Sequence, residues 1–222
     1  MPHSIIIHQT YTDVIIALCK QDTIVAQKII SNKDISKLCV LTIDDLLSEQ
    51  SLQLAHISYI GANTGPGPFS TVRSIIATVN GLHLATRIPL ISIDGLQTLF
   101  GEHDKQNENR SVIALLNAYN NEVYFAFKHN GCHESGYANI DNLLERFQKI
   151  YKNKELLFIG NGSILHERKI TDVFESNTTV ANDKQHASIE YIVMRTYADS
   201  QTQDYKTYLS AEYVKIYSGL TS

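Results

Sequence analysis

Short apolar runs separated by tight polar turns dominate the first part of the chain. Residues 4–9, 14–20 and 23–30 are rich in β-branched side chains, which predicts a three-stranded antiparallel meander. Residues 34–47 then place apolar side chains at helical spacing, and residues 56–61 return to a strand pattern. This order of strands and helices predicts an α/β lobe.

The remaining pattern predicts a second lobe of similar character. Residues 101–110 are charged, rich in amides and almost free of apolar side chains, so we expect a connector there. The expected division is therefore an N-terminal lobe at 1–100 and a C-terminal lobe at 111–222. The other expected elements are helices at 69–86, 95–100, 140–151 and 185–197, and strands at 89–93, 112–118, 122–128, 156–159 and 213–217.

Two of the expected helices, at 34–47 and 69–86, are apolar over more than one face. A surface helix ordinarily shows one apolar arc of about 100°. The stripes consist of Ile35, Cys39, Ile43, Leu46 and Leu47 on the first helix, and Phe69, Val72, Ile76 and Val79 on the second. Leu38 and Leu41 widen the first stripe. Either the two helices pack against each other as well as on a sheet, or part of this surface meets a partner protein.

Composition narrows the class of protein. The chain has 222 residues, 43% of them hydrophobic and 19% charged, with a formal net charge of −4. Its 19 Lys and Arg residues form no basic run, which argues against tight, direct binding of nucleic acid. Three cysteines without a paired spacing indicate reduced thiols. Neither a secretion signal nor a membrane-length apolar stretch is evident, so we expect a cytoplasmic protein.

The segment between the strand at 56–61 and the helix at 69–86 is the most informative motif. Gly65-Pro66-Gly67-Pro68 predicts a sharp, stiff turn that leads directly into a helix start. A helix start carries free N–H groups and a positive dipole end, so glycines there allow an anion or another backbone to approach closely. Local sequence equally allows a connector that binds no ligand.

The longer motif resembles the signature Gly-Pro-Gly-Ser-Phe-Thr-Gly-Leu-Arg of the TsaB family, the actin-like, non-catalytic subunit of the bacterial machinery that makes threonylcarbamoyladenosine in tRNA. The matching residues are Gly65, Pro66, Gly67, Phe69 and Arg73; Ser70 and Val72 are conservative changes, and Pro68 and Thr71 depart from it. Further similar motifs follow in family order, at 80–82, 88–96, 117–124, 159–163 and 213–215.

The resemblance implies an α/β, two-lobed actin-like (ASKHA, ribonuclease-H-like) fold, with mixed sheets flanked by helices. It implies a scaffold subunit that binds and activates a TsaD-like catalytic paralogue, supports a TsaE-like ATPase, and meets tRNA only through the complex. It also implies that the two broad helices form the partner interface, for which we select Leu38, Leu41, Ser70 and Arg73. Without its partner, the chain could form a homodimer.

The residues favour neither a catalytic nor a cofactor site, so we expect no cofactor. His8 lies where actin-like ATPases place an aspartate for Mg²⁺, and a neutral imidazole is a poor ligand for that ion. Gly160-Asn161-Gly162-Ser163 is compatible with a phosphate-binding turn, but a plain strand-ending turn is favoured. His129, Cys132 and His133 are compatible with a zinc site, but a solvated turn is favoured.

Two other functions stay open on this sequence. One is an ATP- or metal-dependent enzyme of the same superfamily, resembling a kinase or a peptidase. The other is a homodimeric interaction protein without any role on tRNA. Nucleotide turnover by the isolated chain would favour the first, and self-association in the presence of a TsaD-like protein would favour the second.

Overall fold

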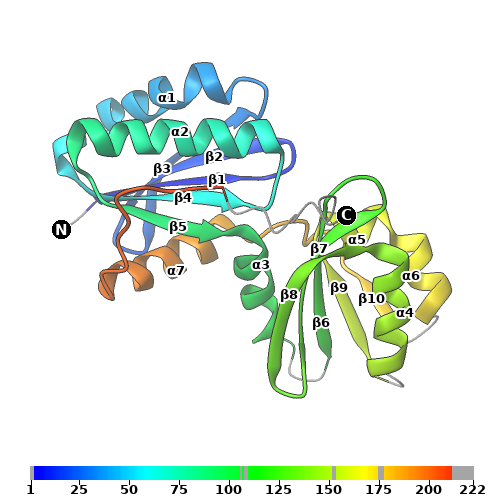
Figure 1. The fold of residues 1–222 in the computed structure, drawn as a ribbon. Coiled ribbons are helices and arrows are strands. Elements are labelled where there is room, and N and C mark those ends of the chain that lie inside the picture. Colours follow the sequence, from blue (N-terminus) through cyan, green and yellow to red (C-terminus); the bar gives the residue numbers. More distant parts are fainter. Residues whose placement is uncertain (1–2, 106, 108–109, 152–153, 175–177, 212–222) are drawn as a thin grey trace, which may run out of the picture. The chain divides into compact units, whose positions relative to one another are not determined.

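The computed structural model describes residues 3–105, 107, 110–151, 154–174 and 178–211, which divide into two units (Figure 1). The N-terminal unit extends to Gly95 and takes up the chain again from Ser188, and the C-terminal unit comprises Leu96–Ala187. Each unit is built on one five-stranded mixed sheet with helices packed on it. The expected α/β architecture is confirmed. Within the described residues, no helix combines the length and the apolar character needed to cross a membrane.

The sheet of the N-terminal unit has the strand order β3-β2-β1-β4-β5. Its strands are β1 (His3–Gln9), β2 (Asp13–Lys20), β3 (Thr23–Ser31), β4 (Ile57–Gly65) and β5 (Leu90–Asp94). The first three strands pair antiparallel, as the meander pattern predicted, while β4 and β5 run parallel to β1. The centre of β1 (Ile5, Ile6 and Ile7) is buried, because helices cover both faces of the sheet.

Helices α1 (Ile35–Glu49) and α2 (Phe69–Thr86) lie side by side on one face of this sheet, and α7 (Ile189–Gln201) covers the other (Figure 1). A short 3₁₀ turn, η1 (Leu54–His56), precedes β4. Both α1 and α2 begin and end within two residues of the predicted bounds. Helix α7 starts later than predicted, because Ser188 caps it by accepting a hydrogen bond from the Tyr191 backbone N–H at 3.2 Å.

The sheet of the C-terminal unit has the order β10-β9-β6-β7-β8. Its strands are β6 (Ser111–Asn117), β7 (Glu122–His129), β8 (Cys132–Asn139), β9 (Leu156–Ile159) and β10 (Thr178–Val180), and its helices are α3 (Gly95–Asp104), α4 (Ile140–Ile150), α5 (Asn161–Leu165) and α6 (Glu167–Phe174). Phe127 on β7, Phe147 on α4 and Phe158 on β9 are fully buried in its core, with Phe127 and Phe147 in edge-to-face contact.

The two sheets share one topology. In each, three antiparallel strands of a meander are followed by two strands parallel to the first, so β6–β10 repeat the arrangement of β1–β5. Self-similarity of the residues did not indicate this duplication. The two units thus have the same strand topology although their sequences differ.

The structure divides the chain at other positions than the lobes expected at 1–100 and 111–222. Leu96, Leu99 and Phe100 are buried, so α3 continues to Asp104 and occupies the start of the expected connector at 101–110. The first part of that polar segment is therefore helical, and its His103 is buried. The strand expected at 213–217 lies outside the described residues.

Candidate functional site

The signature turn is held by a buried asparagine. Asn63, near the end of β4, accepts a hydrogen bond from the Gly65 backbone N–H at 2.8 Å through Oδ1. Its other amide atom, Nδ2, lies 3.2 Å from Nδ1 of His8 on β1. Gly65 has φ 126°, a conformation that favours glycine. The turn between β4 and α2 is thus fixed by a side chain that sequence reasoning had not selected.

The second glycine of the turn, Gly67, is required by close packing. A Cβ atom at this position would lie 1.8 Å from Nε2 of Gln9, the last residue of β1. Gln9 is only 4% exposed, and both polar atoms of its amide lack a hydrogen-bond partner among the described residues. The glycine therefore accommodates a neighbouring side chain of the protein itself.

The end of β1 does not present the donors that a magnesium nucleotide requires. Because Oδ1 of Asn63 accepts from the Gly65 N–H, its Nδ2 is the atom that faces Nδ1 of His8, at 3.2 Å. Mg²⁺ prefers anionic oxygen ligands, whereas His8 and Gln9 offer an imidazole and an amide. These residues do not fit the metal that actin-like ATPases hold at this position, so no chemical step is derived through it.

Helices α1 and α2 each bury one side and leave apolar side chains on the other. Eight of the nine predicted stripe positions are buried. They are Ile35, Cys39, Ile43, Leu46 and Leu47 on α1, and Val72, Ile76 and Val79 on α2. Phe69 is an exception, because it lies in the first turn of α2 and is 57% exposed. Leu38, Val40 and Leu41 are exposed on α1, with Leu41 59% exposed.

The remaining selected residues lie at the start of α2. Ser70 and Arg73 are both exposed, and the Arg73 guanidinium lies 5.0 Å from the centre of the Phe69 ring. This cation–π contact gives the exposed ring a fixed charged neighbour. We call the exposed residues Leu38, Leu41, Phe69, Ser70 and Arg73 the α1–α2 face. It combines apolar surface with one cation, which suits a protein interface.

The residues that are compatible with a zinc site, but for which a solvated turn is favoured, form part of a hairpin. His129 ends β7, Asn130 and Gly131 make the turn with positive φ values, and Cys132 and His133 begin β8. The predicted turn is confirmed, but the sequence did not indicate the strand that follows it. Among the described residues, no group of three His, Cys, Asp or Glu side chains is placed to hold a metal ion.

Two further motifs, at 117–124 and 159–163, meet in the C-terminal unit. The Asn161 side chain accepts a hydrogen bond at 3.1 Å from the backbone N–H of Asn117, where β6 ends. Gly160 packs so closely that an added Cβ would lie 2.1 Å from the carbonyl oxygen of Leu115. The motifs at 117–124 and 159–163 are therefore in direct contact, and this contact requires both Asn161 and Gly160.

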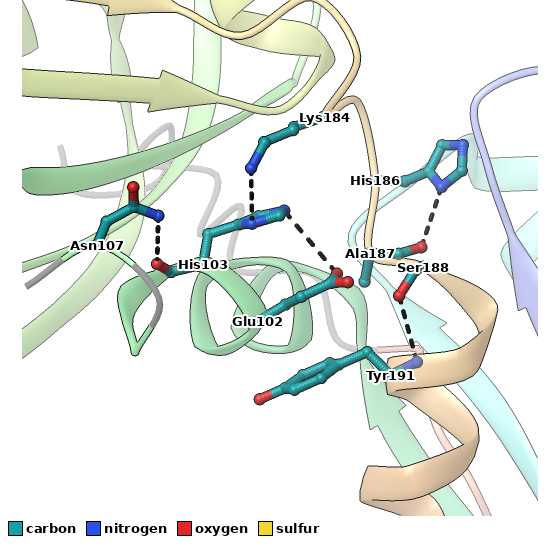
Figure 2. Close-up of polar contacts among 8 residues, drawn as sticks. All are labelled: Glu102, His103, Asn107, Lys184, His186, Ala187, Ser188 and Tyr191. Carbon is teal, nitrogen blue, oxygen red and sulfur yellow. Dashed lines mark hydrogen bonds and ion pairs between the residues drawn. The ribbon is translucent and has the colours of Figure 1, made fainter.

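A histidine in the expected connector makes a contact that the sequence did not indicate. Figure 2 shows Lys184, from the loop after β10, next to the ring of His103 on α3, with Nζ 3.4 Å from Nδ1. The Glu102 carboxylate lies 3.9 Å from Nε2 of the same ring. Burial, reinforced by the charge of Lys184, lowers the pKa of His103. The neutral ring thus ties α3 to the loop at 181–187.

Comparison with solved structures identifies the class to which this duplicated fold belongs. A Pseudomonas aeruginosa protein described as similar to the peptidase YeaZ superposes with a TM-score of 0.73 at 15% identity, covering 97% of this chain and all of the other. YeaZ from the same organism gives 0.66 at 16% identity, over 91% and 94% of the two chains. A Bacteroides thetaiotaomicron protein described as having an actin-like ATPase fold gives 0.51 at 8% identity, over 87% and 95%. The protein therefore belongs to the actin-like fold class.

Sequence comparison identifies the family. The model described as "TsaD: tRNA N6-adenosine threonylcarbamoyltransferase" matches residues 23–211, and the chain belongs to this family. A relative from Bacillus subtilis, named tRNA threonylcarbamoyladenosine biosynthesis protein TsaB, is 25% identical over 177 residues, or 77% of this chain and 76% of the relative. The Escherichia coli protein of that name is 27% identical over 111 residues, 50% and 48% of the two chains. Within the family, the chain has the features of a divergent TsaB.

Proposed function

We propose that this chain acts in the formation of threonylcarbamoyladenosine in tRNA, as a non-catalytic subunit that binds and activates a TsaD-like catalytic paralogue. Its relatives carry the name of that biosynthesis, and the matching family model carries the name of the transferase. A TsaE-like ATPase would act on the assembled pair, and tRNA would be reached through the complex.

The observation that carries this proposal is the α1–α2 face. Leu41 and Phe69 are more than half exposed although α1 and α2 already bury a full apolar side on the sheet. Apolar side chains in this number on adjacent helices lower the free energy of a complex when a partner covers them. Arg73 beside Phe69 adds a charge that can select the partner.

Activation by such a subunit is a shift of conformation in the partner. If the α1–α2 face binds the active form of a TsaD-like protein more tightly than its inactive form, association raises the active population by the ratio of the two affinities. This role requires no reacting group on the present chain. It agrees with the buried imidazole of His8 near the end of β1, where an actin-like ATPase needs an acidic ligand.

Replacement of Leu41 by glutamate tests the interface. Covering an exposed leucine contributes about 1–2 kcal/mol to association, and burying a carboxylate in its place costs several kcal/mol more. We expect Leu41→Glu to weaken binding to the TsaD-like partner by about 100-fold or more. Binding is measured by calorimetry with the purified partner.

Met194→Glu is the matched control, because Met194 is 46% exposed and lies on α7, which covers the opposite face of the N-terminal sheet from α1 and α2. It should leave partner binding within about twofold. Equal binding by both variants and the unaltered protein would remove α1 from the interface. Depletion of the protein from its cells, followed by mass spectrometry of tRNA nucleosides, tests the pathway: unchanged threonylcarbamoyladenosine would contradict the proposed function.

A further inference from the structure

Within the described residues, the chain passes between the two units twice. The first passage lies between Gly95 and Leu96, at the start of α3, and the second lies between Ala187 and Ser188, at the start of α7. On the C-terminal side, these two connections lead into α3 and into the segment 181–187. Hinge motions are absorbed by a few residues that link rigid parts, so any change in the orientation of the units involves these connections.

Both connections are fixed where they enter the N-terminal unit. A Cβ atom at Gly95 would lie 2.8 Å from Nδ2 of Asn63, so the first connection packs closely on the side chain that holds the signature turn. At the second connection, Ser188 accepts a hydrogen bond from the Tyr191 N–H at 3.2 Å and thereby caps α7. The freedom of the two connections therefore depends on contacts within the C-terminal unit.

A side-chain contact in the C-terminal unit joins the two connections. Figure 2 shows Lys184, from the segment 181–187, with its Nζ atom 3.4 Å from Nδ1 of His103 on α3. An ammonium group only donates, so Nδ1 accepts and the ring is neutral when this contact forms. His103 is 7% exposed, although it lies in a polar, charged stretch of the sequence. We call this interaction the His103–Lys184 contact.

The segment 181–187 is also attached by its backbone to the turn after β9. The Gly160 N–H donates to the Lys184 carbonyl oxygen at 2.7 Å, and the Asn161 N–H donates to the following carbonyl at 3.2 Å. Neither bond involves the Lys184 side chain. The segment therefore keeps its place when the ammonium group moves away from His103.

Helix α3 is attached separately, to β7 and β8. Asp104 pairs with Lys128 on β7 at 3.7 Å, and the Phe100 ring lies 5.0 Å from the ring of His133 on β8. The titratable groups that the sheet presents to α3 thus contact Asp104 and Phe100. Loss of the His103–Lys184 contact would separate the two connections and leave both folded.

The charges that face His103 come from α3 itself and from the facing segment. Glu102 lies 3.9 Å from Nε2, and Lys184 and Asp183 act on the ring from the segment. Burial and Lys184 lower the pKa of His103 more than the two carboxylates raise it, so the ring takes up a proton only below the usual range of histidine. Protonation removes the acceptor that Lys184 uses and places two cations side by side.

We propose that protonation of His103 separates α3 from the segment 181–187 and thereby increases the range of orientations that the two units adopt. A fall in pH below about 6.5 is converted into greater motion between the units. A buried histidine that faces a cation across two structural elements is suited to such a switch. The device requires neither ligand nor partner, so it is independent of the proposed function.

Pulsed EPR distance measurements between the two units test the proposal on the full chain. One spin label is attached to Cys132, which is exposed on β8, and the other to the thiol introduced by Ser48→Cys at an exposed position of α1. Cys19 and Cys39 are buried, and burial raises the pKa of their thiols to about 12 and about 11. Because the thiolate is the reactive form, these two side chains should remain unlabelled.

The distance distribution should broaden as the pH falls from about 8 to about 5. The separated form binds the proton at the ordinary pKa of histidine and the joined form only at lower pH. The ratio of the broad to the narrow component should therefore rise by up to about tenfold per pH unit below about 6.5 and then level off. His103→Gln keeps an acceptor for Lys184 but does not titrate, so its distribution should stay narrow. Lys184→Met removes the donor, so its distribution should be broad even at the highest pH.

His166→Gln is the matched control. His166 is also buried in the C-terminal unit, at 6% exposed, and burial together with Lys169 lowers its pKa. It lies between α5 and α6, outside both connections, so its replacement should leave the pH response unchanged. Near-UV circular dichroism verifies at each pH that the units stay folded.

Three results would overturn the proposal. These are a distribution that does not change with pH in the unaltered protein, a pH response that persists in His103→Gln, and a response that is lost in His166→Gln. Leu41→Glu should keep the response, because α1 belongs to the N-terminal unit and takes no part in either connection. Failure of the pH response and failure of the partner interface are therefore separate outcomes.

Discussion

Replacement of Gly67 by alanine should destabilise the N-terminal unit through a collision with Gln9. The new methyl carbon would lie 1.8 Å from Nε2 and 2.8 Å from Cδ of that side chain, whereas ordinary contacts lie at 3.4–4 Å. The amide must move by about 2 Å, and Gln9 is buried, so its side chain leaves its rotamer or displaces neighbours. Overpacking of this kind costs about 1–3 kcal/mol.

A smaller opposite effect acts through the unfolded chain. Alanine restricts the unfolded state more than glycine and thereby recovers about 0.4–1 kcal/mol. We therefore expect a net loss of about 1–2 kcal/mol in the free energy of unfolding for Gly67→Ala. Native-state hydrogen exchange of amides in β1 and β4 reports this quantity for the N-terminal unit alone.

Two further variants make the interpretation specific. Gln9→Ala combined with Gly67→Ala removes the colliding amide, so the double variant should recover most of the loss, which a double-mutant cycle quantifies. Gly81 lies within α2, and an added Cβ there meets nothing within 4 Å, so Gly81→Ala should stabilise the unit by about 0.5–1 kcal/mol. Equal losses for Gly67→Ala with and without Gln9→Ala would refute the collision as the cause.

Two other predictions concern the C-terminal unit. Gly160→Ala should cost about 3 kcal/mol or more, because φ is 92° and the new Cβ would lie 2.1 Å from the Leu115 carbonyl oxygen, a backbone atom that cannot rotate away. Gly131→Ala, at φ 79° in open space, should cost only about 1 kcal/mol, and equal urea midpoints for the two variants would disprove the steric argument. His103 has a lowered pKa, so the unfolded chain binds its proton more readily and stability should fall as pH drops below about 6.5, levelling off below the folded-state pKa. His103→Gln should weaken this dependence in urea titrations across pH, and an unaltered profile would contradict the role assigned to burial and Lys184.

The sequence alone determined those elements whose pattern is local. β-branched runs between tight turns specified the meander of β1, β2 and β3, and apolar residues at helical spacing specified α1, α2 and α4. These signals suffice because the alternation of buried and exposed positions follows directly from strand and helix geometry. The motif at 65–73 also indicated the family without any tertiary information.

Other features depend on contacts between residues far apart in sequence. Strand β8 (Cys132–Asn139) is mostly polar and, in the part of the chain that the structure describes, pairs only with β7, so its strand character comes from the neighbouring strand and not from its own composition. The return of the chain to the N-terminal unit at Ser188 likewise depends on the packing of α7 against the N-terminal sheet, which its local sequence does not specify.

The composition of both candidate sites also depends on tertiary packing. The sequence indicated the α1–α2 face, but only the tertiary structure showed that Phe69 is exposed while Val72 is buried. It likewise brought together His103 and Lys184, which are 81 residues apart in the sequence, and set Gln9 against Gly67. Periodicity states which side of an element is buried; which distant side chains meet follows only from how the elements pack together.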